Sequence, residues 1–141
     1  MIHDYYEIEL TVTADDIDEQ GHANNVAYVA WMQDAAIAHS TANGWGPVVY
    51  EQFGSGFVVR SHFIEYHRPT FDGDRLTVRT WVSSMSRATS LRRYRIFRTD
   101  SPEEIVARGE TRWAFICYAT RQPRRMPKEL IESFAIIDEA L

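Results

Sequence analysis

The chain has 141 residues, of which 45% are hydrophobic and 25% charged, so it can bury one globular core. It contains one cysteine, which excludes a disulfide framework and a multi-cysteine metal site. Its first ten residues hold three acidic side chains and no Lys or Arg, unlike a presequence, and no apolar run approaches the roughly 18–20 residues that span a bilayer. We therefore expect a cytoplasmic protein without a membrane partner.

The net charge of −5 is distributed unevenly along the chain. Residues 1–75 hold twelve acidic and three basic side chains, whereas residues 76–128 hold four acidic and twelve basic ones. All but one of the fifteen basic residues are arginines. Solvated strand faces are one explanation, and a local anion site is the other, because a guanidinium group binds phosphate in a planar, bidentate way. The overall acidity does not fit a nucleic-acid-binding domain, so no nucleic-acid partner is expected.

Hydropathy patterns predict a strand followed by a long helix. Residues 5–13 alternate between apolar and polar side chains, which is the period of a strand with one solvent-exposed face. Residues 26–42 lack glycine and proline and are rich in alanine, with Asn24 or Asn25 as a good N-cap, so they predict a helix of about 25 Å. Its apolar residues do not keep to one stripe, which predicts burial on most sides.

A glycine-rich turn follows at residues 44–56. Four further strands are predicted at residues 57–66, 76–83, 90–98 and 105–119. Residues 128–141 could form a short terminal helix. The short connections favour hairpins and therefore an antiparallel sheet. Because one helix cannot cover both faces of five strands, we expect the sheet to curl around the helix. We also expect its outer surface or edge to pair with another subunit, as a homodimer or homotetramer.

An acidic loop leads directly into the predicted helix. Four carboxylates lie within residues 15–19, and Gly21-His22-Ala23-Asn24-Asn25 follows at once. One interpretation is a solvated loop with a capping asparagine. The other is a catalytic site, because a helix N-terminus offers unpaired N–H groups and a positive dipole end that stabilise an oxyanion. A nearby carboxylate could then act as base or nucleophile.

The segment Asp16-Ile17-Asp18-Glu19-Gln20-Gly21-His22-Ala23-Asn24-Asn25-Val26-Ala27-Tyr28 resembles the D-x-D-x-x-G-H-x-N-N-x-x-Y signature of hotdog-fold acyl thioesterases. These form the 4-hydroxybenzoyl-CoA thioesterase-like group, which includes acyl-carrier-protein thioesterases. The resemblance covers nearly the whole chain. It implies an α+β hotdog fold, a long central helix wrapped by a curved five-stranded antiparallel sheet, as a single domain over residues 1–141. The implied activity is hydrolysis of an acyl-CoA or acyl-ACP thioester to a free acid and a thiol, a reaction of fatty acid metabolism that needs no cofactor.

The resemblance also implies roles for individual residues. It assigns the catalytic carboxylate to Asp18, as either base or nucleophile. The other catalytic positions shape the site or lend backbone N–H groups to the thioester carbonyl, and they are His22, Asn24 and Asn25. Val26 and Tyr28 belong to the substrate-binding positions. Arg87 lies in a predicted turn, where relatives carry basic residues that contact the phosphates of coenzyme A.

Thioester hydrolysis also needs an apolar channel for the acyl group. Phe57, Val58 and Val59 could line it, together with Trp31 and Met32, which are otherwise plain core residues. No metal ligand set is expected, because the histidines are scattered along the chain. Two other functions stay open: an enoyl-thioester hydratase or dehydratase of the same fold, although its usual histidine motif is absent, and a non-catalytic acyl-thioester-binding domain.

Overall fold

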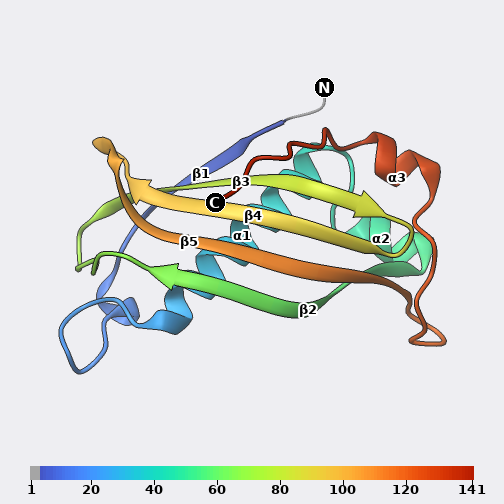
Figure 1. Cartoon of the computed structure of the whole chain (residues 1–141). Helices are drawn as coiled ribbons and strands as arrows, with labels where there is room; N and C mark the ends of the chain where they lie inside the picture. The colour runs from blue at the N-terminus through green and yellow to red at the C-terminus, as the bar shows by residue number, and fades with distance from the viewer. Residues whose placement is uncertain (1–3) are drawn as a thin grey trace.

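The computed structural model describes residues 4–141, in which one five-stranded sheet curves around a long helix (Figure 1). The strands are β1 (Tyr6–Thr11), β2 (Ser55–Tyr66), β3 (Arg75–Ser86), β4 (Thr89–Arg98) and β5 (Ser101–Cys117). The helices are α1 (Asn25–Ala42), α2 (Pro47–Phe53) and α3 (Lys128–Glu132), and a 3-10 turn, η1, covers Ala14–Asp16. The strand order is β1-β3-β4-β5-β2 and the four pairings are antiparallel, as predicted. Over residues 4–141, no helix is both long and apolar enough to cross a bilayer.

Helix α1 begins where the sequence predicts. The side chain of Asn24 accepts a hydrogen bond from the N–H of Ala27 at 2.9 Å and so caps the first turn. One side of the helix packs on the sheet and is buried, comprising Ala27, Tyr28, Trp31, Met32, Ala35, Ala36 and His39. The opposite side faces outward, and Val26 and Ile37 are 75% and 52% exposed there. The prediction that α1 is buried on most sides is therefore wrong for a single chain, because the sheet covers only one side of it.

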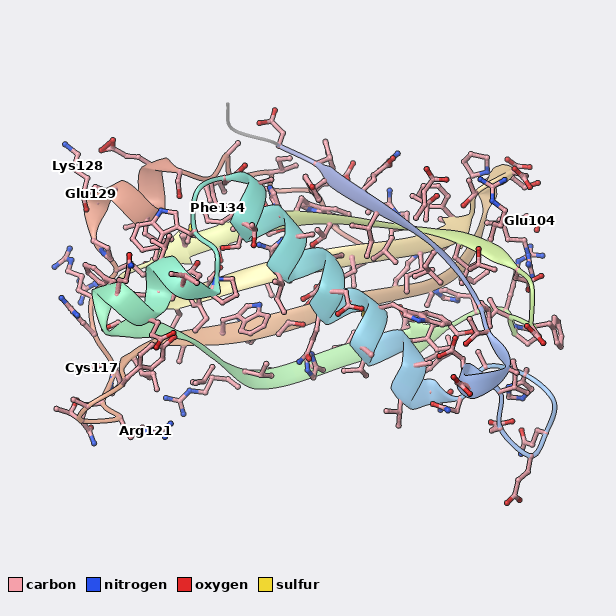
Figure 2. The ribbon with its side chains drawn as sticks, turned by 180° about the vertical axis from the view of Figure 1, so that it is seen from behind. Glu104, Cys117, Arg121, Lys128, Glu129 and Phe134 are labelled. Atoms are coloured by element: carbon pink, nitrogen blue, oxygen red, sulfur yellow. The ribbon has the colours of Figure 1, made fainter. Side chains whose placement is uncertain are left out.

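Helix α1 crosses the sheet diagonally (Figure 2). It starts beside β2, where the hydroxyl of Tyr66 donates to the carbonyl of Asn25 at 3.2 Å. It ends beside β1, where the rings of Tyr6 and His39 stack at 5.4 Å. The C-terminal half of α1 therefore lies away from the first half of β2.

Close packing between α1 and β5 sets the distance from the helix to the sheet. Gly109 lies in β5 opposite Ile64 of β2, and Met32 packs over it. A Cβ atom at Gly109 would lie 2.9 Å from both Sδ and Cε of Met32 and 3.3 Å from the carbonyl oxygen of Phe63. A larger side chain does not fit here unless Met32 and the helix move.

Three elements differ from the sequence predictions. The glycine-rich stretch contains α2, which begins at Pro47 and ends at Gly54 with a positive φ of 81°, and this helix is too short to produce a clear periodic signal. Strand β5 covers Ser101–Cys117, so it begins four residues before the strand predicted at residues 105–119. The terminal helix is limited to α3, and the chain beyond it follows β3, where the N–H of Ile137 donates to the carbonyl of Val82 at 2.9 Å.

The two ends of the sheet carry different elements (Figure 1). The loop before α1 lies at the end of the β2–β3 connection, and the N–H of Ala23 donates to the carbonyl of Thr70 at 2.8 Å. The β3–β4 turn, α2 and α3 lie at the opposite end, where the N–H of Met126 donates to the carbonyl of Arg87 at 2.8 Å. Strand β3 connects the two ends with 12 residues. At roughly 3.3 Å per residue, these ends are about 40 Å apart.

Replacing Gly109 by valine should lower the free energy of unfolding by about 2–3 kcal/mol, because the added side chain overpacks the contact with Met32. Denaturant unfolding followed by circular dichroism measures this loss. Adding Met32→Ala to Gly109→Val should recover part of it, because truncation of Met32 makes room. If the double variant loses as much free energy of unfolding as the two single variants together, this assignment is contradicted.

Candidate functional site

The loop before α1 forms a small hairpin. The N–H of Asp18 donates to the carbonyl of His22, and the N–H of Gly21 donates to the carbonyl of Asp18, both at 3.0 Å. Gly21 takes a positive φ of 88° in this turn, a conformation that favours glycine. An antiparallel bridge joins Ile17 to Ala23. The hairpin therefore leads directly into Asn24, the N-cap of α1.

Asp18 and His22 are neighbours in this hairpin, and about one-third of each side chain is exposed. Oδ1 of Asp18 accepts a hydrogen bond from the N–H of Gln20 at 2.8 Å, whereas Oδ2 lies 3.9 Å from Nδ1 of His22. Nε2 of His22 lies 3.0 Å from Oε1 of Gln20. The carboxylate also borders an open depression formed with Ile17 and Glu19. It is thus held by one oxygen and accessible to a small molecule.

The other acidic residues of the loop have different surroundings. Oδ2 of Asp16, the first aspartate of the motif, accepts hydrogen bonds from the N–H and hydroxyl of Thr13, at 3.0 and 3.3 Å. These bonds close a capping box on η1, so Asp16 has a structural role. Asp15 and Glu19 are exposed on the surface.

The first turn of α1 presents two unpaired N–H groups. The N–H of Ala27 is taken by the cap, whereas those of Asn25 and Val26 make no hydrogen bond to any described residue outside the helix. The first N–H groups of a helix have no partner inside it either. These two groups and the positive end of the helix dipole can stabilise negative charge on a carbonyl oxygen.

Tyr28 packs the start of α1 against Thr70 and Tyr66. It is 2% exposed, and its hydroxyl lies 2.8 Å from Oγ1 of Thr70. Its ring meets that of Tyr66 edge-on at 5.1 Å. Burial raises the pKa of Tyr28, so its hydroxyl stays protonated at neutral pH. Tyr28, predicted to bind substrate, is therefore enclosed in this chain and anchors the helix to the β2–β3 connection.

An apolar cavity of about 340 Å³ lies at the other end of α1, between this helix, α2 and the inner face of the sheet. Its walls include Ile37, Trp45, Tyr50, Phe57, Trp113 and Phe134. Figure 2 shows Phe134 beside the C-terminal end of α1. The volume lies within the range of small-molecule binding sites. Sequence reasoning missed most of this wall because its residues come from α1, α2, four strands and the C-terminal segment, which meet only in the folded chain.

The predicted channel residues behave differently from one another. Phe57 lines the cavity, as expected. Val58 pairs with Ala114 and lies on the opposite face of β2, because successive strand residues alternate between faces. Val59 is 37% exposed and does not border the cavity. Trp31 and Met32, at 7% and 2% exposure, are core residues.

The predicted site residues thus form two separate groups. Asp18, His22, Asn24, Asn25 and Val26 gather at the N-terminus of α1. The cavity begins just over two helical turns further along, since Asn25 and Gln33 are about 12 Å apart at 1.5 Å per residue. Arg87 is exposed in the β3–β4 turn, with a positive φ of 57°, at the far end of the sheet. A single chain does not bring the two groups together.

The part of the chain that the structure describes contains no ligand set for a metal ion. From Asp4 to Leu141, no three side chains of His, Cys, Asp or Glu converge on a point that could hold a metal ion.

Comparisons with known proteins agree with this architecture. A family model described as the Thioesterase-like superfamily matches residues 12–134, and the chain belongs to this family. A 1,4-dihydroxy-2-naphthoyl-CoA thioesterase from Synechocystis has the same fold, with a TM-score of 0.85 and 18% identity over 96% of this chain and 99% of that chain. A DHNA-CoA thioesterase from Staphylococcus aureus matches with a TM-score of 0.80 and 24% identity, over 87% of this chain and 81% of that chain. A further Staphylococcus aureus protein, solved in complex with CoA, matches with a TM-score of 0.85 and 17% identity, over 94% of this chain and 83% of that chain.

The class that the fold and the family define is the hotdog-fold thioester hydrolases.

Proposed function

We propose that this protein hydrolyses an acyl thioester of coenzyme A or acyl-carrier protein, with Asp18 as base or nucleophile. The observation that carries the proposal is the exposed Asp18 carboxylate on the hairpin that leads into α1, whose first turn offers the unpaired N–H groups of Asn25 and Val26. Membership of the thioesterase family supports the reaction class. The neighbour in complex with CoA favours a coenzyme A thioester over an acyl-carrier-protein thioester.

The chemistry follows from these groups. The thioester carbonyl oxygen accepts hydrogen bonds from the backbone N–H groups of Asn25 and Val26. These bonds stabilise the negative charge that develops on the oxygen as the carbonyl carbon becomes tetrahedral. Asp18 either removes a proton from an attacking water molecule or attacks the carbon itself, forming an anhydride that water then hydrolyses. In the first route the C–S bond of the tetrahedral intermediate breaks, and the proton held by Asp18 passes to the departing thiolate. In the second route the C–S bond breaks as the anhydride forms, the thiolate takes a proton from water, and hydrolysis of the anhydride releases the acid and restores Asp18.

We further propose that two subunits share each active site. Strand β2 is an edge strand, since one side pairs with β5 and the other pairs with no described strand. Two copies that pair antiparallel through this side, related by a two-fold axis, would bring Tyr66 of one β2 near Phe57 of the other. Tyr66 touches Asn25 at the catalytic end, and Phe57 lines the cavity. The catalytic loop of one subunit would then lie beside the cavity of its partner.

Asp18→Asn should lower kcat by about 10²–10⁴-fold with little change in stability, because the amide keeps the shape but cannot act as base or nucleophile. Asp15→Asn, on the same loop, is the matched control and should retain near-normal turnover. A thiol-trapping dye with a panel of acyl-CoA substrates measures both. Near-normal activity in Asp18→Asn would refute the assignment.

Shared sites predict an oligomer and activity in mixed subunits. Light scattering should give at least a dimer at micromolar concentration. Ile37→Trp should block the cavity from its exposed rim, and Asp18→Asn should disable the catalytic loop. After the two inactive variants are mixed and reassembled, about a quarter of wild-type activity should return, because half of the dimers are hybrids with one intact site of two. A fully active monomer, or no recovery in confirmed hybrids, would contradict the shared site.

Arg87 is proposed to contact the phosphates of coenzyme A across the same interface. Arg87→Asn, in which asparagine tolerates the positive φ, should raise KM for acyl-CoA several-fold and leave kcat nearly unchanged. The effect should shrink at high ionic strength and vanish for a short acyl thioester without the nucleotide. Arg121→Asn is a matched control, since Arg121 is exposed with a φ of 61°. An equal effect of both variants, or an effect on both kinds of substrate, would exclude a specific phosphate contact by Arg87.

A further inference from the structure

Arg92 is a buried arginine on the wall of the cavity. It lies in β4 opposite Val82 of β3, on the sheet face that packs against α1, and it is only 6% exposed. Nη1 of Arg92 donates to Nδ1 of His39 at 2.9 Å and to Oγ1 of Thr80 at 3.1 Å. The centre of the guanidinium lies 5.9 Å from the centre of the Phe134 ring. These contacts hold the cation at one position beside the cavity.

Within residues 4–141, the charge of Arg92 has no carboxylate partner. Among the described residues, none lies within 4.0 Å of Arg92, whereas the adjacent Arg93 pairs with Glu110 at 3.1 Å. Nε and Nη2 of Arg92 make no hydrogen bond to residues 4–141. Burial lowers the pKa of Arg92, and the nearby hydroxyls of Tyr94 and Tyr50 oppose this shift. Arginine nevertheless stays protonated in proteins, so the site holds a buried, uncompensated cation.

The other polar groups of the cavity wall are neutral. The hydroxyls of Ser40, Tyr50 and Ser90 are engaged, whereas the indole N–H of Trp113 has no hydrogen-bond partner among the described residues. Oγ of Ser40 donates to the carbonyl of Trp45 at 2.6 Å and lies 2.9 Å from the Tyr50 hydroxyl. Oγ of Ser90 donates to the carbonyl of Ser84 at 3.0 Å. Most of the remaining wall is aromatic or aliphatic. A matching ligand therefore has an apolar body and one anionic end, because a buried charge needs an opposite charge with hydrogen bonds.

We propose that the cavity selects acyl groups with a carboxylate at the end distal to the thioester, and that Nε and Nη2 of Arg92 bind this carboxylate. This inference rests on the proposed thioesterase function. In the proposed dimer, the acyl group extends from the partner subunit's catalytic loop into the cavity, so its distal end meets Arg92. A guanidinium edge and a carboxylate form two parallel hydrogen bonds, which fix position as well as charge.

The test compares acyl-CoA substrates that have the same number of acyl carbons, with and without a terminal carboxylate. The carboxylates are succinyl-, glutaryl-, adipoyl- and suberoyl-CoA, and each is paired with the neutral straight-chain acyl-CoA. Wild-type kcat/KM should be at least about 10-fold higher for the best carboxylate than for its neutral partner. Arg92→Met keeps an unbranched apolar stem and removes the charged guanidinium. It should lower kcat/KM for the carboxylate by about 10- to 100-fold and leave the neutral substrate unchanged or improved.

Arg95→Met is the matched control. Arg95 lies three residues along β4 on the outer face, over the ring of Trp81 at 5.3 Å, so the carboxylate-to-neutral ratio should not change. A wild-type protein that shows no preference at any length, or an unchanged ratio in Arg92→Met, would overturn the proposal and leave the thioesterase function intact. If Arg92→Met does not fold, Arg92→Lys keeps the charge without the planar fork. It should reduce the preference at unchanged activity on the neutral substrate, and a full preference in Arg92→Lys would overturn the bidentate contact.

Failure of the thioesterase function itself would appear as no hydrolysis of any acyl-CoA. Calorimetry with two non-hydrolysable thioethers, S-(5-carboxypentyl)-CoA and S-hexyl-CoA, then decides the role of Arg92 separately. Binding of the carboxylate at least about 10-fold more tightly, with this advantage lost in Arg92→Met, supports the proposal. Equal binding of the two thioethers overturns it.

Discussion

The packing of α1 on the inner face of the sheet is the constraint on which both candidate binding regions depend. At the middle of the helix, Met32 rests on Gly109, and a larger residue there would require the end of the Met32 side chain to shift. From that contact the helix crosses diagonally, beginning beside β2 and ending beside β1 (Figure 2). The diagonal leaves the first half of β2 uncovered by α1. The cavity forms there, closed by Tyr50 of α2 and by Trp45, which precedes this helix.

The two regions favour negative charge by different physical means. At the start of α1, unpaired backbone N–H groups and the helix dipole supply partial positive charge to a group that becomes negative only during the reaction. In the cavity, the guanidinium of Arg92 carries a full charge without a carboxylate partner among the described residues, which suits an anion present before the reaction begins. Most of its strand neighbours differ: Arg93 and Arg98, for example, form ion pairs with Glu110 and Asp74.

The length of α1 separates these regions within one chain. Pairing of two subunits through the edge of β2 would bring the regions together. An acyl group that reached from the start of α1 to the cavity of the same chain would have to extend along the helix by about 12 Å before it met the first lining residue, Gln33. Antiparallel pairing of two β2 strands removes this requirement, because the two-fold axis exchanges the ends of the strand. The apolar side chains of Val26, Ile37 and Val59, exposed in a single chain, would be candidates for coverage by the second subunit.

By itself, the sequence determined most of the local elements, α2 excepted, and it singled out the loop before α1. The bounds of α1 and the succession of strands along the chain follow from periodicity within a few residues, and capping chemistry indicates Asn24 or Asn25. Asp18 and His22 were identified by the resemblance of their motif. Only the tertiary structure decided that Phe57 lines a cavity while Val58 does not, and that Tyr28 is an anchor. In the sequence, Arg92 is one of four similar arginines in an apparently solvated strand. Its burial depends on His39, Thr80 and Phe134, which are distant in the chain and meet it only after folding.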